Sequence, residues 1–338
     1  MKTPRELVYE TLEFKNPSRV PRQLWILPWA QIHYPEKLQK IQKDFPDDII
    51  SAPGYYTEFP KTYGNPYAVG EYIDEWGCKF TNYQEGIIGE IKDPLVKEEG
   101  WEDVENIHLP YELLNIDIAK INEFCGGSDK FVMASACPRP FERLQFIRGT
   151  EQLYIDLMLR PARMDEFIKR MHDYYCQLLT AWAKTDVDSL SFMDDWGSQN
   201  TLLINPDIWV EMFKPLYRDY IDIAHSFGKK IFMHSDGHIF DIFPHLIELG
   251  LDAINSQIFC MDMDKLKEYR GKITFWGEID RQHILANGSL EEVRAAVNKV
   301  KDNLWDSGGC IAQGEFSIGS NPDNVYEMFK AWDEIGLQ

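Results

Sequence analysis

Short apolar runs that alternate with helical patterns constrain the fold of this chain more than any other feature of its sequence. Eight such runs lie at residues 23–28, 48–52, 131–136, 189–193, 230–234, 253–257, 273–277 and 310–314. Amphipathic helical patterns lie between most of them, at residues 163–184, 206–226, 239–248, 290–304 and 323–335. Eight strands that alternate with helices are typical of a (β/α)8 barrel, the α/β fold also called the TIM barrel. We therefore predict this fold.

Helix boundaries support the same interpretation. Asn205-Pro206 and Asn321-Pro322 each place a capping residue before a proline at the first helical position. Ser289 followed by Glu292 forms a capping box. Glycines at positions 228, 250, 271 and 308 follow helical patterns and precede the next apolar run, as expected where helices end.

Residues 1–338 contain no Gly/Ser-rich or Pro-rich linker, so we predict a single barrel domain. The spacing between the second and third runs is too long for a simple crossover. Residues 55–95 alternate apolar and polar positions there and predict a β-rich insertion on one face of the barrel. A doubly wound open sheet is the alternative, but no GxGxxG motif follows any of the runs.

The composition excludes several classes of partner. The chain has 35 Lys and Arg against 55 Asp and Glu, a net charge of −20, which argues against nucleic acid or an anionic membrane. No segment is long and apolar enough for a membrane span, and the charged start MKTPRELVYETLEF does not read as a secretory signal. The six cysteines are scattered singly. We therefore expect a cytoplasmic protein with free thiols.

Polar residues at the carboxyl ends of the runs are the candidates for chemistry, because active sites of such barrels lie there. His234 and Asp236 lie two positions apart at the end of the fifth run and share a face. Glu315 ends the eighth run and would face the same mouth. An imidazole and two carboxylates predict a zinc site with an open position. In the alternative reading, His234 bonds a loop and Asp236 caps the next helix.

Two adjacent acids follow the fourth run. Asp194 and Asp195 cannot both point inward, so one would face the cavity and the other would cap the following turn. A carboxyl group at an apolar mouth beside Trp196 could have a raised pKa and act as a general acid. The alternative is a pair of solvated loop acids.

Aromatic and amide side chains near other strand ends are candidates for substrate binding. The predicted contacts are Trp25, Trp29, Gln31, Trp196, Gln257 and Glu278. Asp280 shares a face with Glu278, but we assign it a structural role because Arg281 follows it. Aromatic residues are more often core than ligand platform, so a packing role stays open for the tryptophans. No GxSxG, P-loop or HExxH motif is present.

Several stretches together resemble the uroporphyrinogen decarboxylase superfamily. They are NPSRVPRQLWI (16–26), DEWGCKF (74–80), CPRPFERLQFIRG (137–149), the segment 192–221 that begins FMDDWGSQN, GKKIFMHSDGHI (228–239), LDAINSQ (251–257) and TFWGEIDRQHIL (274–285). The resemblance covers essentially the whole chain and keeps the family's order. It also implies a (β/α)8 barrel.

The resemblance implies one of two activities. Uroporphyrinogen decarboxylases carry an arginine-containing stretch after the first strand and a catalytic Asp after the second. This chain has LWILPWAQIHY and DIISAPGYY at those places; the first contains no arginine, and the second has no Asp at the family's position after the strand. The other branch contains corrinoid-dependent methyltransferases. Its coenzyme M members hold zinc with His-x-Cys and a later Cys, where this chain has His234, Asp236 and Glu315. Carboxylates in place of thiolates suit an oxygen-bearing substrate.

The resemblance therefore implies a methyltransferase that demethylates a small methoxylated substrate. Zinc on His234, Asp236 and Glu315 would activate the ether oxygen, and Asp194 or Asp195 would protonate or steady the leaving alkoxide. A separate corrinoid protein would accept the methyl group, and a homodimer is suggested by the resemblance alone. The alternatives are a tetrapyrrole decarboxylase with an unusual pocket and a non-catalytic barrel that binds a small molecule.

Overall fold

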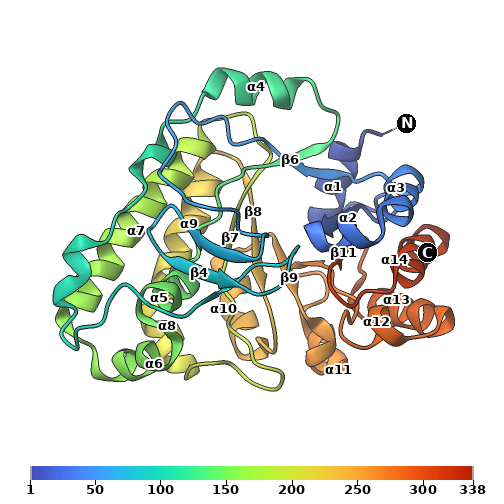
Figure 1. Cartoon of the computed structure of the whole chain (residues 1–338). Helices are drawn as coiled ribbons and strands as arrows, with labels where there is room; N and C mark the ends of the chain where they lie inside the picture. Colours follow the sequence, from blue (N-terminus) through green and yellow to red (C-terminus); the bar gives the residue numbers. More distant parts are fainter. Residues whose placement is uncertain (1, 337–338) are drawn as a thin grey trace.

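The computed structural model describes residues 2–336 as a barrel of eight parallel strands surrounded by helices (Figure 1). The strands are β1 (Arg22–Ile26), β2 (Ile49–Ser51), β6 (Phe131–Met133), β7 (Ser189–Met193), β8 (Lys230–Ser235), β9 (Ala253–Ser256), β10 (Thr274–Trp276) and β11 (Cys310–Phe316). Their hydrogen-bonded order is β1-β11-β10-β9-β8-β7-β6-β2. Each of the eight predicted runs overlaps a strand of the sheet, and the predicted (β/α)8 fold is confirmed.

The last seam of the barrel, between β1 and β2, is held in part by side chains. Asp48 N donates to the carbonyl oxygen of Arg22 (2.9 Å), and the Asp47 carboxylate accepts from Leu24 N (2.8 Å). Asp48 also accepts from both terminal nitrogens of Arg19. The barrel is therefore nearly closed, with carboxylates replacing part of a regular strand ladder.

Helices cover the outside of the barrel. They are α1 (Pro4–Leu12), α2 (Pro28–His33), α3 (Pro35–Asp44), α4 (Ile118–Gly126), α5 (Pro140–Arg148), α6 (Thr150–Leu159), α7 (Ala162–Ala183), α8 (Pro206–Met212), α9 (Lys214–Ser226), α10 (Phe243–Leu249), α11 (Met263–Leu266), α12 (Ile284–Asn287), α13 (Leu290–Leu304) and α14 (Pro322–Glu334). Figure 1 shows α7 and α9 along one flank, and α13 and α14 on the other. The predicted caps at Asn205, Asn321 and Ser289 are all made.

One predicted helix is divided in the structure. The pattern over residues 206–226 predicts one continuous helix, but α8 ends at Met212 and α9 begins at Lys214. Pro215 has no N–H to donate to the preceding turn, and its ring crowds that turn, so the helix restarts there. The predicted helix at 239–248 likewise begins with a short 3₁₀ turn before α10.

The long connection between β2 and β6 contains a three-stranded antiparallel sheet. Its strands are β3 (Gly70–Ile73), β4 (Lys79–Asn82) and β5 (Glu90–Ile91), inside the predicted β insertion. The excursion continues beyond residue 95 through two 3₁₀ turns and α4. Trp29 N donates to the carbonyl oxygen of Gly86 (3.2 Å), so the insertion contacts the segment after β1.

The core lies in two places. One cluster fills the barrel interior, where Phe131, Phe232 and Trp276 pack with Val8 and Leu12 of α1. The larger cluster lies between the sheet and the helices.

The six cysteines are free, as predicted. Among residues 2–336, no helix combines the length and the apolar character that crossing a bilayer requires.

Candidate functional site

Three potential metal donors meet at the carboxyl ends of β7 and β8. Met193 pairs with His234 in the strand ladder, so the loop after β7 lies beside the end of β8. His234 Nε2 is 3.5 Å from Asp195 Oδ1 and 3.7 Å from Asp236 Oδ1. The donor atoms of these three residues lie within 4.8 Å of one another. We call Asp195, His234 and Asp236 the mouth cluster.

A hydrogen-bond chain fixes the orientation of the His234 ring. Asn255 Nδ2 donates to the carbonyl oxygen of Trp276 and to Gln313 Oε1, the latter at 2.8 Å. Asn255 Oδ1 therefore faces His234 and accepts from its Nδ1, at 2.6 Å. A proton on Nδ1 leaves Nε2 directed at the two carboxylates. Such a bond to the second ring nitrogen is typical of metal-binding histidines.

Asp236 has one engaged oxygen and one buried oxygen without a partner. Its Oδ2 accepts from Arg281, whereas its Oδ1 has no hydrogen-bond partner among the described residues. Buried polar atoms are normally paired, so an orphaned carboxylate oxygen beside an imidazole nitrogen requires an explanation. Asp195 Oδ1 accepts from Asp236 N (3.0 Å), which holds the two loops together. Nitrogen and oxygen donors at these positions fit a divalent metal ion.

Arg281 joins the mouth cluster to two further acids. Its guanidinium contacts Asp236, lies 3.1 Å from Glu315 Oε2 and lies 3.5 Å from Glu278 Oε1. Glu315 thus lies at the predicted rim, but its carboxylate faces Arg281. Of the predicted zinc ligands, the structure brings His234 and Asp236 together and adds Asp195 as the third close donor.

The charges of the mouth shift several pKa values. Burial opposes ionisation of Asp195, but hydrogen bonding to His234 outweighs it and the pKa of Asp195 lies below its usual range. Burial lowers the pKa of His234, but the carboxylates of Asp195 and Asp236 raise it by more, and the result is a pKa of about 9. Burial raises the pKa of Glu278 to about 8, with Arg281 acting in the opposite direction. The mouth therefore holds an excess of carboxyl groups, as a cation site requires.

Asp194 and Trp196 point away from the mouth. Asp194 is fully buried and accepts from Tyr217 Oη (2.6 Å) and from Glu142 N at the start of α5 (2.8 Å). Burial raises the pKa of Asp194 well above its usual value. Trp196 is also fully buried, stacks on Phe141 with ring centroids 4.1 Å apart and donates to Tyr217 Oη. Of the two adjacent acids, Asp195 faces the cluster and Asp194 caps α5.

The predicted contacts from the first strand are divided. The Trp25 ring lies 5.3 Å from the His234 ring and 5.1 Å from Trp276, so it packs directly beside the mouth cluster. Trp29 instead stacks on His33, with centroids 4.3 Å apart, and Gln31 is exposed on α2.

Gln257 and Glu278 line a small cavity of about 80 Å³. Asp280 accepts from Gln282 N and His283 N, which fits the predicted structural role, but Arg281 is not its partner.

A larger cavity of about 330 Å³ lies between the insertion and helices α5 and α7. Its lining is rich in aromatic rings and also carries charged groups; it includes Tyr56, Tyr72, Trp76, Phe80, Tyr174, Arg139 and Glu142. Glu142 of this lining donates its N–H to Asp194, the residue before Asp195, so the cavity wall is bonded next to the mouth cluster. None of the predicted substrate contacts lines it.

A family model described as uroporphyrinogen decarboxylase (URO-D) matches residues 74–335, which include the mouth cluster and most of the lining of the larger cavity. The chain belongs to the uroporphyrinogen decarboxylase family. The resemblance indicated by the sequence motifs is therefore confirmed. No curated protein matches the chain.

Comparison with solved structures shows a likeness in fold over nearly the whole chain. A methyltransferase from Methanosarcina mazei is similar over 99% of this chain and 99% of its own, with a TM-score of 0.71 and 14% identity. At that identity the likeness establishes the fold. A 3-keto-D-glucoside 4-epimerase from E. coli is similar over 71% of this chain and 96% of its own, at 12% identity. Its TM-score of 0.40 is too low to support an argument.

Three contributors to the site were missed from the sequence. Asn255 orients His234, Arg281 engages Asp236 and Glu315, and the insertion supplies aromatic side chains such as Trp76 to the larger cavity. Asn255 could have been found, because an amide inside the apolar stretch AINSQ implies a buried partner. The contacts of Arg281 could not, because they span three separate strand ends.

Proposed function

We propose that this family member takes a methyl group from a small methoxylated substrate and passes it to the corrinoid of a partner protein, with zinc held by Asp195, His234 and Asp236. The unpaired Asp236 Oδ1 beside His234 Nε2 carries the proposal, because one bound metal ion would give both donor atoms a partner. The fold likeness to a methyltransferase supports it. Glu315 was the expected third ligand, and its engagement with Arg281 favours Asp195 instead.

The chemistry divides between the bound groups and the residues of this chain. When bound, zinc would polarise the ether oxygen as a Lewis acid, and the corrinoid of the partner would accept the methyl group. Oxygen and nitrogen donors suit an oxygen-bearing substrate. Asn255 fixes the orientation of the His234 ring, and Trp25 restricts the space beside that ring. The cavity of about 330 Å³ would hold the rest of the substrate against its aromatic wall.

The ether oxygen keeps the electron pair of the broken carbon–oxygen bond, so the product alcohol needs one proton. Asp194 is fully buried and bonded to Tyr217, so it cannot reach the substrate directly. Asp195 has a lowered pKa and is ionised at neutral pH. Glu278 has a pKa raised to about 8 by burial and still carries a proton there. We assign the proton donor to Glu278 and a positioning role to Asp194.

Zinc content of purified variants tests the ligand set. We expect Asp195→Asn and Asp236→Asn each to contain about one zinc per chain less than the wild type, by elemental mass spectrometry. Glu315→Gln is the matched control and should keep the wild-type zinc content. Equal zinc in Asp236→Asn and the wild type would contradict the site.

Activity is tested separately, by supplying methoxylated compounds and reduced corrinoid proteins. We expect methyl transfer by the wild type and its loss in Asp236→Asn. Conversion of uroporphyrinogen to coproporphyrinogen by the wild type, with no methyl transfer, would instead support the decarboxylase alternative.

A further inference from the structure

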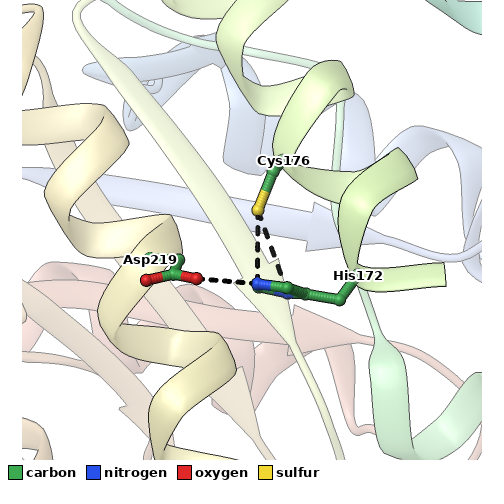
Figure 2. A group of neighbouring side chains, drawn as sticks. All are labelled: His172, Cys176 and Asp219. Atoms are coloured by element: carbon green, nitrogen blue, oxygen red, sulfur yellow. Dashed lines mark hydrogen bonds and ion pairs between the residues drawn. The ribbon is translucent and has the colours of Figure 1, made fainter. Parts of the chain in front are cut away.

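A second group of potential metal donors lies on the outside of the barrel. His172 and Cys176 come from α7 and Asp219 comes from α9, and the three side chains converge between the two helices (Figure 2). His172 Nε2 lies 2.8 Å from Asp219 Oδ2 and 3.5 Å from Cys176 Sγ. All three donor atoms lie within 4.8 Å of one another. We call these residues the shell cluster.

Helix geometry produces this convergence. His172 and Cys176 are four residues apart on α7, so they lie on the same face one turn from each other. Asp219 lies on α9, which packs directly on α7. Neither helix contributes to the mouth cluster, so the shell cluster is a separate site.

The spacing of the shell cluster is close to that of a zinc site. With Zn–S near 2.3 Å and Zn–N near 2.0–2.1 Å, tetrahedral geometry puts the sulfur and nitrogen about 3.5 Å apart. Cys176 Sγ and His172 Nε2 have that separation, but Sγ also lies 3.8 Å from Nδ1 and so sits over the ring. The imidazole must therefore turn to bring its Nε2 lone pair and Sγ onto one ion. Asp219 Oδ2 is now at hydrogen-bond distance from Nε2 and would move outward by about half an ångström in such a site.

The surroundings make the shell cluster reachable from solvent and offer the imidazole a partner for its second nitrogen. The Asp219 side chain is 55% exposed, whereas that of His172 is 12% exposed, so an ion would enter from the Asp219 side. The Tyr220 ring packs 5.3 Å from the His172 ring, and its hydroxyl lies 3.4 Å from Nδ1. Tyr220 can thus accept from Nδ1–H and leave Nε2 for a metal.

We propose that His172, Cys176 and Asp219 form a second metal site, which binds Zn²⁺ or the chemically similar Co²⁺ and ties α7 to α9. Binding replaces the Cys176 thiol proton, which is released to solvent, so one proton leaves for each ion bound. A water molecule completes the tetrahedral set. The site stabilises the helical shell behind β7 and β8, because α7 leads into β7 and α9 leads into β8.

Cobalt titration distinguishes the two sites, because the mouth cluster contains no sulfur donor. We expect both the wild type and Asp236→Asn to develop a thiolate-to-cobalt charge-transfer band, which should saturate at one equivalent in Asp236→Asn because that variant lacks the mouth site. Cys176→Ser and His172→Ala should lack the band. Cys260→Ala is the control for a thiol near the mouth and should retain it. No band in the wild type, or a persistent band in Cys176→Ser, would overturn the site.

Zinc-dependent stability gives an independent measurement. In the Asp236→Asn background, zinc at one hundred times the dissociation constant should raise Tm by about 4 °C. Adding Asp219→Asn replaces an exposed side chain, so the fold should survive while the zinc affinity falls at least tenfold. An equal zinc-induced shift with and without Asp219→Asn would contradict the role of this carboxylate.

Discussion

Two groups of charged residues in this barrel differ in how completely their polar atoms are paired. Arg148 and Asp156 form an ion pair at 2.6 Å with both side chains 2% exposed. Asp156 also accepts from Trp101 Nε1 and Gln152 Nε2, and Arg148 donates to the carbonyl oxygens of Val96 and Glu98. This buried pair is well satisfied by hydrogen bonds, which is what a structural ion pair needs to offset its desolvation.

The mouth cluster is incompletely satisfied by comparison. Within residues 2–336, Asp236 Oδ1 has no hydrogen-bond partner, and the guanidinium of Arg281 is shared by Asp236, Glu278 and Glu315. The number of carboxyl groups exceeds what this cation can neutralise. This contrast indicates that the pair at α5–α6 maintains the fold, whereas the mouth cluster leaves a donor atom unpaired, as is typical of functional sites.

The largest effect should come from removing one member of the satisfied pair. Asp156→Ala leaves the Arg148 guanidinium buried without its carboxylate, so we expect a loss of about 3–5 kcal/mol in the free energy of unfolding. Urea denaturation measures it. Asp165→Ala is the control, because its partner Arg160 is partly exposed, and it should cost under about 1 kcal/mol. Similar losses in both variants would remove the contrast with the mouth.

Removing the shared cation of the mouth should give a loss that a metal can reverse. Arg281→Met leaves three carboxyl groups without their guanidinium, so we expect the metal-free protein to lose about 1–3 kcal/mol of stability. Zinc supplies positive charge and should recover more stability in this variant than in the wild type. Urea unfolding with and without zinc measures the difference. A loss that is independent of zinc would mean that Arg281 serves packing alone.

Disturbing the orientation of His234 should cost metal affinity without removing a ligand. Asn255→Ala deletes the acceptor for His234 Nδ1–H, and we expect the zinc affinity of the mouth to fall about 10- to 100-fold. Competition with a zinc chelator measures it, in a Cys176→Ser background that silences the shell cluster. Asn255→Asp keeps an acceptor and should retain most of the affinity. Equal affinities for the wild type and Asn255→Ala would show that the ring needs no such support.

Much of the fold was predictable because parallel strands are buried on both faces and read as continuous apolar runs. The run 189–193 is β7 to the residue. His234 and Asp236 were predictable together for a local reason, since positions two apart at a strand end share a face. The division of α8 from α9 was also readable from Pro215, but the amphipathic pattern outweighed it.

The rest depended on contacts between distant segments. Glu315 has the right residue type at the right rim, yet Arg281 from another loop engages it. Trp196 follows a strand like a mouth residue, but it turns into the core because Phe141 and Tyr217 offer a stacking surface and an acceptor. Side-chain direction in irregular backbone is set by such partners, and a local pattern does not encode them.

Asp47 lies between the fully bonded Arg148–Asp156 pair and the incompletely bonded mouth cluster, because its carboxylate accepts from one backbone N–H. Its substitution should have the smallest effect on the free energy of unfolding. Asp47 at the β1–β2 seam accepts from Leu24 N, and burial raises its pKa to about 6. The folded chain therefore binds more protons than the unfolded chain between about pH 4 and 6, so this group makes the free energy of unfolding fall as pH rises through that range. Asp47→Asn keeps an acceptor oxygen and should reduce this decline in urea unfolding across the same range. The exposed Asp129→Asn is the control and should leave the wild-type profile unchanged. A profile for Asp47→Asn equal to that of the wild type would show that water already solvates the seam.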